Sequence, residues 1–377
     1  VSTTFGSARR SIGPAASPRR LGSGPPLDLD RVDVEPTGRP AVTAVEVLRR
    51  WDTRALVVLR AGELAVEWVA PGHDVDRPQR CYSVTKSMTG TLLADLIVAG
   101  AVSRADRVDE LVPPLAASGF GDATVGDLAD MTVELAYVED YAEIAGGSSR
   151  GDAHDFGDYV VALGMHDGDA AVDDGAARTI RDLLPRIGRG PGPHGAAFHY
   201  ATPVTDAVGW VIEEVTGRDV VDLFVERIWA PSGASASAGW GLDPAGTPGV
   251  GAGLEVTTHD LARIGLLLAA CARGEGPAGS VSEEALAEVR RGGSTEVFAA
   301  DGHYAYLGPY SYRDQWWIPC GPHGPISAWG IYGQFLWVDP DRDVVVACHG
   351  RGRAPSDPGR DLDQHALCVA LTDALSR

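Results

Sequence analysis

Two pairs of strand-like apolar runs, one pair near each end of the chain, constrain the fold most strongly. Residues 55–70 (ALVVLRAGELAVEWVA) hold two β-rich runs separated by Ala-Gly, a typical hairpin turn. Residues 333–350 (GQFLWVDPDRDVVVACHG) hold two more around Asp-Pro-Asp-Arg. Patterns between the pairs are mostly helical, so we expect one antiparallel sheet built from both chain ends, with a helical insertion.

Helical spacing of apolar residues marks five segments. They are residues 41–50, 83–100, 202–217, 257–274 and 362–377. The predicted fold class is therefore α/β (α+β). We predict three parts: a flexible or loosely packed N-terminal arm (1–40), a sheet domain (41–100 with 301–377), and a mostly helical subdomain with long loops (101–300).

Charge and composition exclude several classes of partner. A formal net charge of -20 would repel nucleic acid and anionic membranes. No apolar run approaches the roughly 18 to 20 residues that span a bilayer, and residues 1–26 lack the apolar core of a signal peptide. Five scattered cysteines without a CxxC pair suit reduced thiols, so we expect a cytoplasmic protein. The cysteines are Cys81, Cys271, Cys320, Cys348 and Cys368.

The only lysine of the chain, Lys86, follows Ser83 by three residues at the start of a predicted helix; the other basic side chains are 31 arginines. Positions i and i+3 share a helix face, so the two side chains face the same place. A serine hydroxyl needs a base, and lysine can lose its proton when buried whereas arginine cannot. A capping serine beside a solvated lysine is the ordinary alternative. The surrounding residues 84–98 are apolar nearly all round, which favours the catalytic interpretation.

Two further segments could complete a Ser-Lys site. In FHYAT (198–202), Tyr200 precedes a predicted helix, where a phenol could pass a proton; taken alone, it is more often a core or loop residue. In ISAWGIYGQFLWV (326–338), Gly330 permits close approach of a ligand, and the N–H of Ile331 could donate to an oxyanion. Neither segment is specific by itself.

These three segments, in this order, resemble the serine β-lactamase and penicillin-recognising superfamily. The Ser-Asp-Asn and Lys-Thr-Gly motifs of class A are absent. Tyr-Ala-Thr stands where class C enzymes and related esterases have Tyr-x-Asn or Tyr-x-Ser, and Ala-Trp-Gly (328–330) replaces Lys-Thr-Gly. The resemblance is closest to the branch of 6-aminohexanoate-dimer hydrolases and related carboxylesterases, over about residues 45–377. It rests on SVTKSMTGTL, YVEDY (137–141), FHYAT with VGWVIEEVTG, TTHDLARIG, YRDQWW (312–317) and GIYGQFLWVDP.

The resemblance implies a role for each matching position. Ser83 would be the nucleophile, Lys86 the base and Tyr200 the proton relay, with the N–H groups of Ser83 and Ile331 forming the oxyanion hole. The implied substrate-binding residues are Glu139, Tyr141, Trp317 and Gly330. From the sequence alone, YVEDY would be an acidic loop with packed tyrosines.

The implied activity is a serine hydrolase that cleaves short-chain esters and small linear amides such as 6-aminohexanoate oligomers, with no cofactor and no metal. The expected partner is a small-molecule substrate, and a homodimer is an alternative to a monomer. A β-lactamase or D-peptidase, and a penicillin-binding sensor without turnover, stay open. Gly251 stands where the oligomer hydrolases can carry a polar residue, which predicts weaker binding of a substrate amine. The Gly-x-Ser-x-Gly match at Ser149 lacks the strand and helix that a nucleophile elbow requires.

Overall fold

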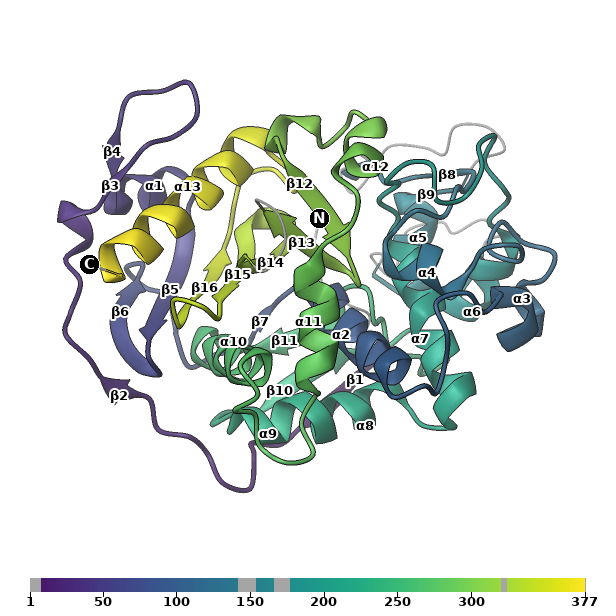
Figure 1. Cartoon of the computed structure of the whole chain (residues 1–377), viewed down its shortest axis with the longest axis horizontal. Coiled ribbons are helices and arrows are strands. Elements are labelled where there is room, and N and C mark those ends of the chain that lie inside the picture. Colours follow the sequence, from purple (N-terminus) through teal and green to yellow (C-terminus); the bar gives the residue numbers. More distant parts are fainter. Residues whose placement is uncertain (1–7, 142–153, 166–176, 320–323, 377) are drawn as a thin grey trace.

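An eight-stranded sheet forms the centre of the molecule (Figure 1). The computed structural model describes residues 8–141, 154–165, 177–319 and 324–376. The strand order is β12-β13-β14-β15-β16-β5-β6-β2, antiparallel throughout except that β2 runs parallel to β6. β16 pairs with β5, so the two chain ends meet in one sheet, as predicted. The strands are β2 (Gly22–Ser23), β5 (Thr53–Arg60), β6 (Glu63–Val69), β12 (Tyr310–Arg313), β13 (Trp316–Pro319), β14 (Ile326–Gly330), β15 (Gln334–Asp339) and β16 (Val344–Gly350).

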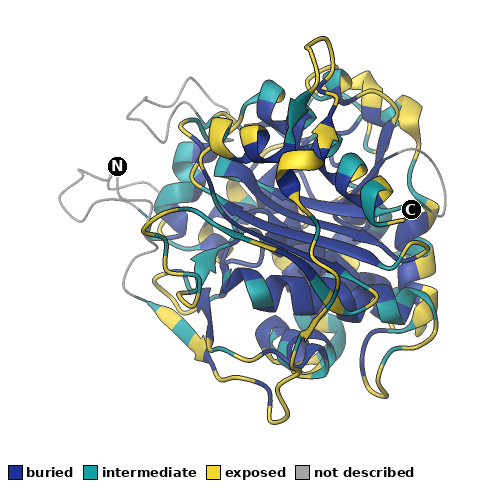
Figure 2. Cartoon of the chain, turned by 90° about the vertical axis from the view of Figure 1, so that its left-hand side faces the viewer, coloured by how far each residue is buried: buried dark blue, intermediate teal, exposed yellow. Residues whose placement is uncertain are grey.

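Helices cover both faces of this sheet, and its central strands are buried on both sides, whereas β6 and β2 at one edge are partly exposed (Figure 2). α10 (Thr258–Ala272) lies on one face, where a Cβ added to Gly265 would come within 2.5 Å of Val345 and 2.9 Å of Leu336. α1 (Ala44–Arg50) and α13 (Pro358–Leu375) cover the other face. Burial on both faces explains why β5, β15 and β16 contain continuous apolar runs, whereas β6 places Glu63 and Glu67 in solvent.

The predicted hairpin turn between β5 and β6 is confirmed. Ala61 and Gly62 have φ of 50° and 78°, and positive φ at both central residues is the geometry of a type I′ turn. This turn matches the right-handed twist of the strands it joins.

Helix α2 (Val84–Val98) runs through the interior, and every side chain from Val84 to Asp95 is buried. It passes directly beneath the β12–β13 turn, where a Cβ on Gly90 would lie 2.0 Å from the carbonyl oxygen of Asp314. α7 (Thr202–Thr216) packs beside it, begins with Pro203 in its first turn and ends at Gly217 with φ of 65°. The two helices that carry Ser83, Lys86 and Thr202 are thus fixed by the core.

The predicted loosely packed arm differs from the structure over residues 8–40. β1 (Arg9–Ile12) joins a four-stranded sheet in the order β1-β10-β11-β7, with β10 (Ala238–Gly241), β11 (Leu254–Val256) and β7 (Gln79–Arg80). β2 extends the large sheet, and β3 (Asp33–Val34) pairs with β4 (Val42–Thr43). Backbone pairing with distant segments orders this arm, and its Gly/Pro/Ser-rich composition gives no local sign of such pairing.

Residues 101–300 supply the remaining helices. α10 and α11 (Glu283–Arg291) from this stretch pack on the large sheet and on α2, respectively, whereas α3 to α7 gather on one side of the molecule (Figure 1). The shorter elements are α3 (Val108–Leu111), α4 (Val125–Ala129), β8 (Tyr137–Val138), β9 (His154–Asp155), α5 (Phe156–Ala162), α6 (Ile180–Leu183), α8 (Val220–Phe224), α9 (Ala230–Ser232) and α12 (Thr295–Ala300). Among the described residues, no helix is both long and apolar enough to cross a bilayer. Ser149 and Cys320 lie outside the described residues.

Candidate active site

Ser83 sits at the N-terminus of α2 without capping it. It occupies the N-cap position, yet its side chain makes no capping hydrogen bond. The preceding residue, Tyr82, has φ of 47°, a conformation that is costly for a residue with a side chain and that recurs at functional sites. Upstream, the N–H of Cys81 donates to the carbonyl of Leu254 at 2.8 Å, which ties the turn to the small sheet. The hydroxyl is therefore presented to the site and not used by the helix.

Lys86 is buried beside Ser83, with 1% of its surface exposed. Its Nζ lies 2.9 Å from Ser83 Oγ, 3.0 Å from Thr202 Oγ1 and 3.0 Å from the carbonyl oxygen of Gly251. The charged ammonium donates one hydrogen to each of these three oxygens. The alternative of a capping serine with a solvated lysine is excluded by these contacts.

When Lys86 is neutral, the same contacts fix the orientation of its amine. The carbonyl oxygen of Gly251 can only accept a hydrogen bond. The hydroxyl of Thr202 donates its own hydrogen to Glu139, so its oxygen is also an acceptor toward Lys86. These two acceptors hold the two hydrogens of a neutral amine and leave its lone pair for the hydroxyl of Ser83. The arrangement suits removal of the Ser83 proton.

Burial lowers the pKa of Lys86 to about 8, against the opposing attraction of Glu139 and Asp206. Asp206 is 4% exposed, and burial raises the pKa of its carboxyl to about 7. Its Oδ1 accepts the N–H groups of Val250 and Gly251 at 3.1 and 3.3 Å. The lysine can thus lose its proton near neutral pH, which an exposed lysine would not do.

Tyr200 lies next to the Ser83–Lys86 pair. The Lys86 ammonium stands 5.1 Å from the centre of its ring, and Tyr200 and Ser83 line the same pocket. Burial and the negative charge of Glu139 raise the pKa of this phenol, and the neighbouring Ser83 hydroxyl opposes this shift only in part. Tyr200 therefore remains a protonated hydroxyl, able to donate and accept beside the nucleophile.

The end of β14 approaches the Ser83 turn closely. A Cβ on Gly330 would lie 2.5 Å from the carbonyl oxygen of Cys81, so only glycine fits without displacing backbone. Ile331 follows and lines the same pocket as Ser83. Tyr332 then has φ of 63°, and its ring lies 5.6 Å from that of Tyr82. The two segments expected to supply the oxyanion hole are therefore in direct contact.

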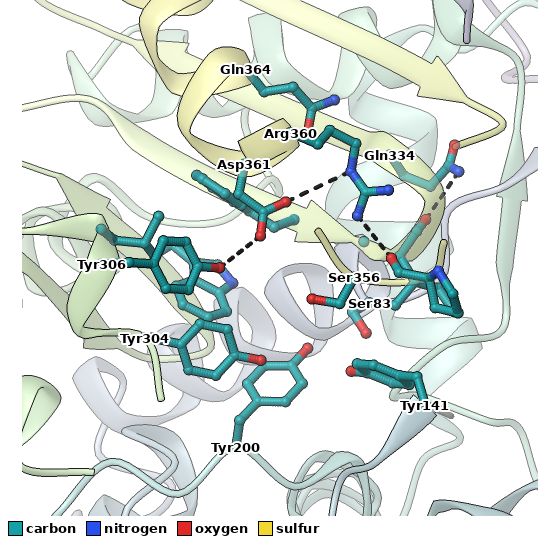
Figure 3. A pocket seen from close by; sticks show the side chains of 16 residues that line it. Ser83, Tyr141, Tyr200, Tyr304, Tyr306, Gln334, Ser356, Arg360, Asp361 and Gln364 are labelled. Carbon is teal, nitrogen blue, oxygen red and sulfur yellow. Dashed lines mark hydrogen bonds and ion pairs between the residues drawn. The ribbon is translucent and has the colours of Figure 1, made fainter. Parts of the chain in front are cut away.

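A pocket of about 470 Å³, open mouth included, lies in front of Ser83 (Figure 3). Aromatic side chains form one part of its wall, where Trp317 packs against Tyr200 with ring centres 5.7 Å apart. The only charged side chains among the described lining residues are Arg360 and Asp361, from the start of α13. The aromatic residues and leucine of the lining are Tyr141, Tyr200, Tyr304, Tyr306, Leu307, Trp317 and Trp329.

The charged pair is held by its own contacts on the wall opposite Tyr200 (Figure 3). Arg360 donates to the carbonyl oxygens of Ala354 and Pro355 at 2.8 Å each, which fixes that loop over the pocket. The hydroxyl of Tyr306 donates to Asp361 at 2.7 Å, and burial raises the pKa of Asp361 to about 6. The pocket thus combines an aromatic wall with one ion pair, in which Arg360 Nε lies 3.7 Å from Asp361 Oδ1.

The structure brings most of the predicted residues together. Ser83, Tyr141, Tyr200, Trp317, Gly330 and Ile331 line one pocket, and Lys86 lies directly behind Ser83. Glu139, predicted to bind substrate, instead contacts the N-terminus of α7, where it accepts the N–H of Thr202 at 2.8 Å as well as the Thr202 hydroxyl. Gly251 is buried against Thr202 and faces Lys86 rather than the pocket.

Sequence reasoning did not identify Thr202, Asp206, Arg360 or Asp361. Thr202 had a usable signal, since it is the third residue of Tyr-Ala-Thr, where the resemblance places a polar residue. Asp206 had a weaker signal, because it lies four residues after Thr202 and therefore shares its helix face. Nothing local marks the pair at the start of α13, which reaches the pocket through the tertiary fold.

The fold and the site together define a serine hydrolase of the β-lactamase/DD-peptidase-like type. The family model described as Beta-lactamase matches residues 50–371, and the chain belongs to this family. It is 32% identical over 333 residues to the 6-aminohexanoate-dimer hydrolase of Paenarthrobacter ureafaciens, covering 88% of this chain and 80% of that protein.

Solved structures share the fold. A candidate 6-aminohexanoate-dimer hydrolase from Bacillus anthracis superposes with a TM-score of 0.83 at 24% identity, covering 98% of this chain and 91% of that one. A family VIII carboxylesterase has a TM-score of 0.57 at 17% identity, covering 87% of this chain and 96% of that one. At these identities the structural likeness speaks for the architecture alone.

Proposed function

We propose that the protein cleaves short-chain carboxylic esters and small linear amides through an acyl-enzyme on Ser83. The observation that carries the proposal is the buried amine of Lys86, 2.9 Å from Ser83 Oγ, with Thr202 and Gly251 accepting its hydrogens. In the neutral state the lone pair of Lys86 takes the proton of Ser83 as the oxygen attacks the carbonyl carbon of the substrate.

The rest of the reaction would use Tyr200 and Ile331, which line the same pocket as Ser83. The N–H groups of Ser83 and Ile331 would hold the oxyanion at the N-terminus of α2. The proton on Lys86 then passes, through the Tyr200 hydroxyl, to the leaving alcohol or amine as the bond to it breaks. Water then attacks the acyl carbon and gives a proton to Lys86 through Tyr200. The pair returns that proton to Ser83 Oγ as the bond from Oγ to the acyl carbon breaks, which releases the acid and restores Ser83.

The substrate class is supported by the relatives and by the pocket. The curated relative at 32% identity is named for an amide dimer, and the aromatic walls suit an extended apolar chain. The position that carries lysine and threonine in Lys-Thr-Gly is Ala328-Trp329 here, which removes the usual partners of a β-lactam carboxylate. Esters and linear amides are therefore favoured over β-lactams.

The test is a substrate panel on the wild type and on Ser83→Ala. It contains p-nitrophenyl acetate and butyrate, the linear dimer of 6-aminohexanoate, and a chromogenic cephalosporin. We expect ester turnover with an initial burst of one nitrophenol per active site, slower amide cleavage, and loss of all turnover in Ser83→Ala. Retention of most ester turnover by the variant would reject Ser83 as the nucleophile.

Two other outcomes would replace the proposal. Turnover of the cephalosporin faster than of the esters would indicate a β-lactamase or D-peptidase. Labelling of Ser83 by a fluorescent penicillin without steady turnover of any substrate would indicate a binding sensor.

A further inference from the structure

We propose that Asp206 is a positioning residue for Lys86: it fixes the loop of Val250 and Gly251 so that the Gly251 carbonyl holds one N–H of the catalytic amine. This inference rests on the proposed function, because it concerns the base of that reaction. Neither the comparisons nor the sequence motifs assign a role to Asp206.

The contacts form a continuous path from the carboxylate to the amine. Asp206 lies one turn after Thr202 on α7, on the same helix face. Its Oδ1 accepts two successive N–H groups, from Val250 and Gly251, at 3.1 and 3.3 Å. The Gly251 carbonyl then accepts from Lys86 Nζ at 3.0 Å.

Close packing also restricts the loop of Val250 and Gly251, in addition to its contact with Asp206. A Cβ on Gly251 would lie 2.7 Å from the Thr202 side chain, and a Cβ on Gly209 of α7 would lie 2.6 Å from Val250. From α2, the Thr89 hydroxyl donates to the Val250 carbonyl at 3.0 Å. α2 and α7 therefore clamp the loop from two sides, and Asp206 supplies the acceptor for its buried N–H groups, which would otherwise be costly to leave unpaired.

The negative charge has a second effect on Lys86. Besides the Thr202 hydroxyl and the Gly251 carbonyl, the polar and ionisable groups around the amine are Ser83, Tyr200, Glu139 and Asp206, and the phenol of Tyr159 lies beside Asp206. Of these, Glu139 and Asp206 attract the ammonium and oppose the effect of its burial. An ionised Asp206 thus favours the ammonium, so removing its charge should make Lys86 easier to deprotonate.

Two substitutions of Asp206 separate its positioning of the Gly251 loop from the effect of its charge on Lys86. Asp206→Asn keeps an oxygen that can accept the two N–H groups but removes the charge. We expect kcat at the alkaline plateau to stay within about threefold of the wild type, and the acid limb of kcat/KM to move to lower pH by about half a unit or more. Asp206→Ala also removes the acceptor, so kcat should fall about tenfold or more at all pH values, with KM within about twofold.

Asp243→Asn is the matched control. Asp243 is fully buried and accepts the N–H groups of Ile180, Ala245 and Thr247, but it is not among the groups that face Lys86. Its substitution should lower the melting temperature without moving the acid limb.

The outcomes are distinguishable. The role of the Asp206 charge is overturned if the acid limb of kcat/KM is unchanged in Asp206→Asn. It is also overturned if the limb moves as far in Asp243→Asn as in Asp206→Asn. If Asp206→Ala folds and keeps the wild-type kcat, the positioning role is overturned. If Asp206→Ala does not fold, the test is Asp206→Asn: a kcat at the alkaline plateau more than tenfold below the wild type overturns the positioning role. If Ser83→Ala retains ester turnover, the proposed function has failed, whatever the Asp206 variants do.

Discussion

At the scale of single residues, the chemistry depends on an amine that is both buried and aimed. Burial alone would only lower the pKa of Lys86; the two obligate acceptors, Thr202 and the Gly251 carbonyl, direct its lone pair toward Ser83. Arginine cannot replace it, because a guanidinium does not release a proton in proteins. Lys86→Arg should therefore lower kcat for p-nitrophenyl acetate about a thousandfold or more. Circular dichroism should show a folded variant, and turnover near the wild-type rate would exclude Lys86 as the base.

The same residue sets the pH dependence. Burial lowers the pKa of Lys86 to about 8, and only the neutral amine accepts a proton. Activity should accordingly rise as pH increases through this value and be small at pH 6. A profile of kcat/KM from pH 5.5 to 9.5, corrected for spontaneous ester hydrolysis, measures this limb. A flat profile over that range would contradict an ionising lysine base.

Substitutions of Thr202 test the orientation of the Lys86 amine separately from its role as the base. Thr202→Val removes the acceptor for one Lys86 hydrogen and the donor to Glu139, so the amine loses its orientation. We expect kcat to fall about tenfold to a hundredfold, with KM nearly unchanged. Thr202→Ser keeps the hydroxyl and should retain most of the activity. Equal losses in both variants would indicate that packing, and not the hydroxyl, matters at this position.

At the scale of elements, the site is assembled where the end of β14 meets the turn before α2. The contact leaves no room for a side chain on Gly330, because its Cβ would lie 2.5 Å from the Cys81 carbonyl oxygen. Gly330→Ala should push Ile331 away from Ser83 and lower kcat about a hundredfold, similar to the loss of one oxyanion donor. Gly13→Ala is a suitable control, since a Cβ there meets nothing within 4 Å. Wild-type kcat in Gly330→Ala would refute the proposed oxyanion hole.

The elements also show how far the sequence predicts this protein. Local periodicity and the i, i+3 rule place both hairpins, helix α2, and Ser83 beside Lys86, because these features depend on neighbours in the chain. Asp206 and Gly251 lie 45 residues apart, and Glu139 and Thr202 lie 63 apart. Such pairs depend on how α7 packs between distant loops, and no short pattern encodes that packing. The pairing of the N-terminal arm escaped prediction for the same reason, since β1 pairs with residues more than 200 positions away and β2 with residues 41 positions away.

At the scale of the whole molecule, the N-terminal arm joins the two sheets at their edges. β1 adds to the small sheet that anchors the Ser83 turn, and β2 adds to the large one. Between them, the Gly13 carbonyl accepts from the indole of buried Trp229 at 2.8 Å. The described part of the arm thus contributes pairing and burial, and none of its residues lines the catalytic pocket.

Deleting residues 1–24 should therefore destabilise the protein without changing its chemistry. The deletion removes the β1 and β2 pairings, exposes surface covered by Ile12 and leaves the Trp229 indole without its acceptor. We expect the melting temperature to fall by about 3 °C or more, with kcat at 20 °C within about twofold of the full chain. A deletion of residues 1–7 keeps every one of these contacts and is the control. An unchanged melting temperature in the longer deletion would show that the arm adds no net stability, and a large loss of kcat in the folded deletion would show that it shapes the site.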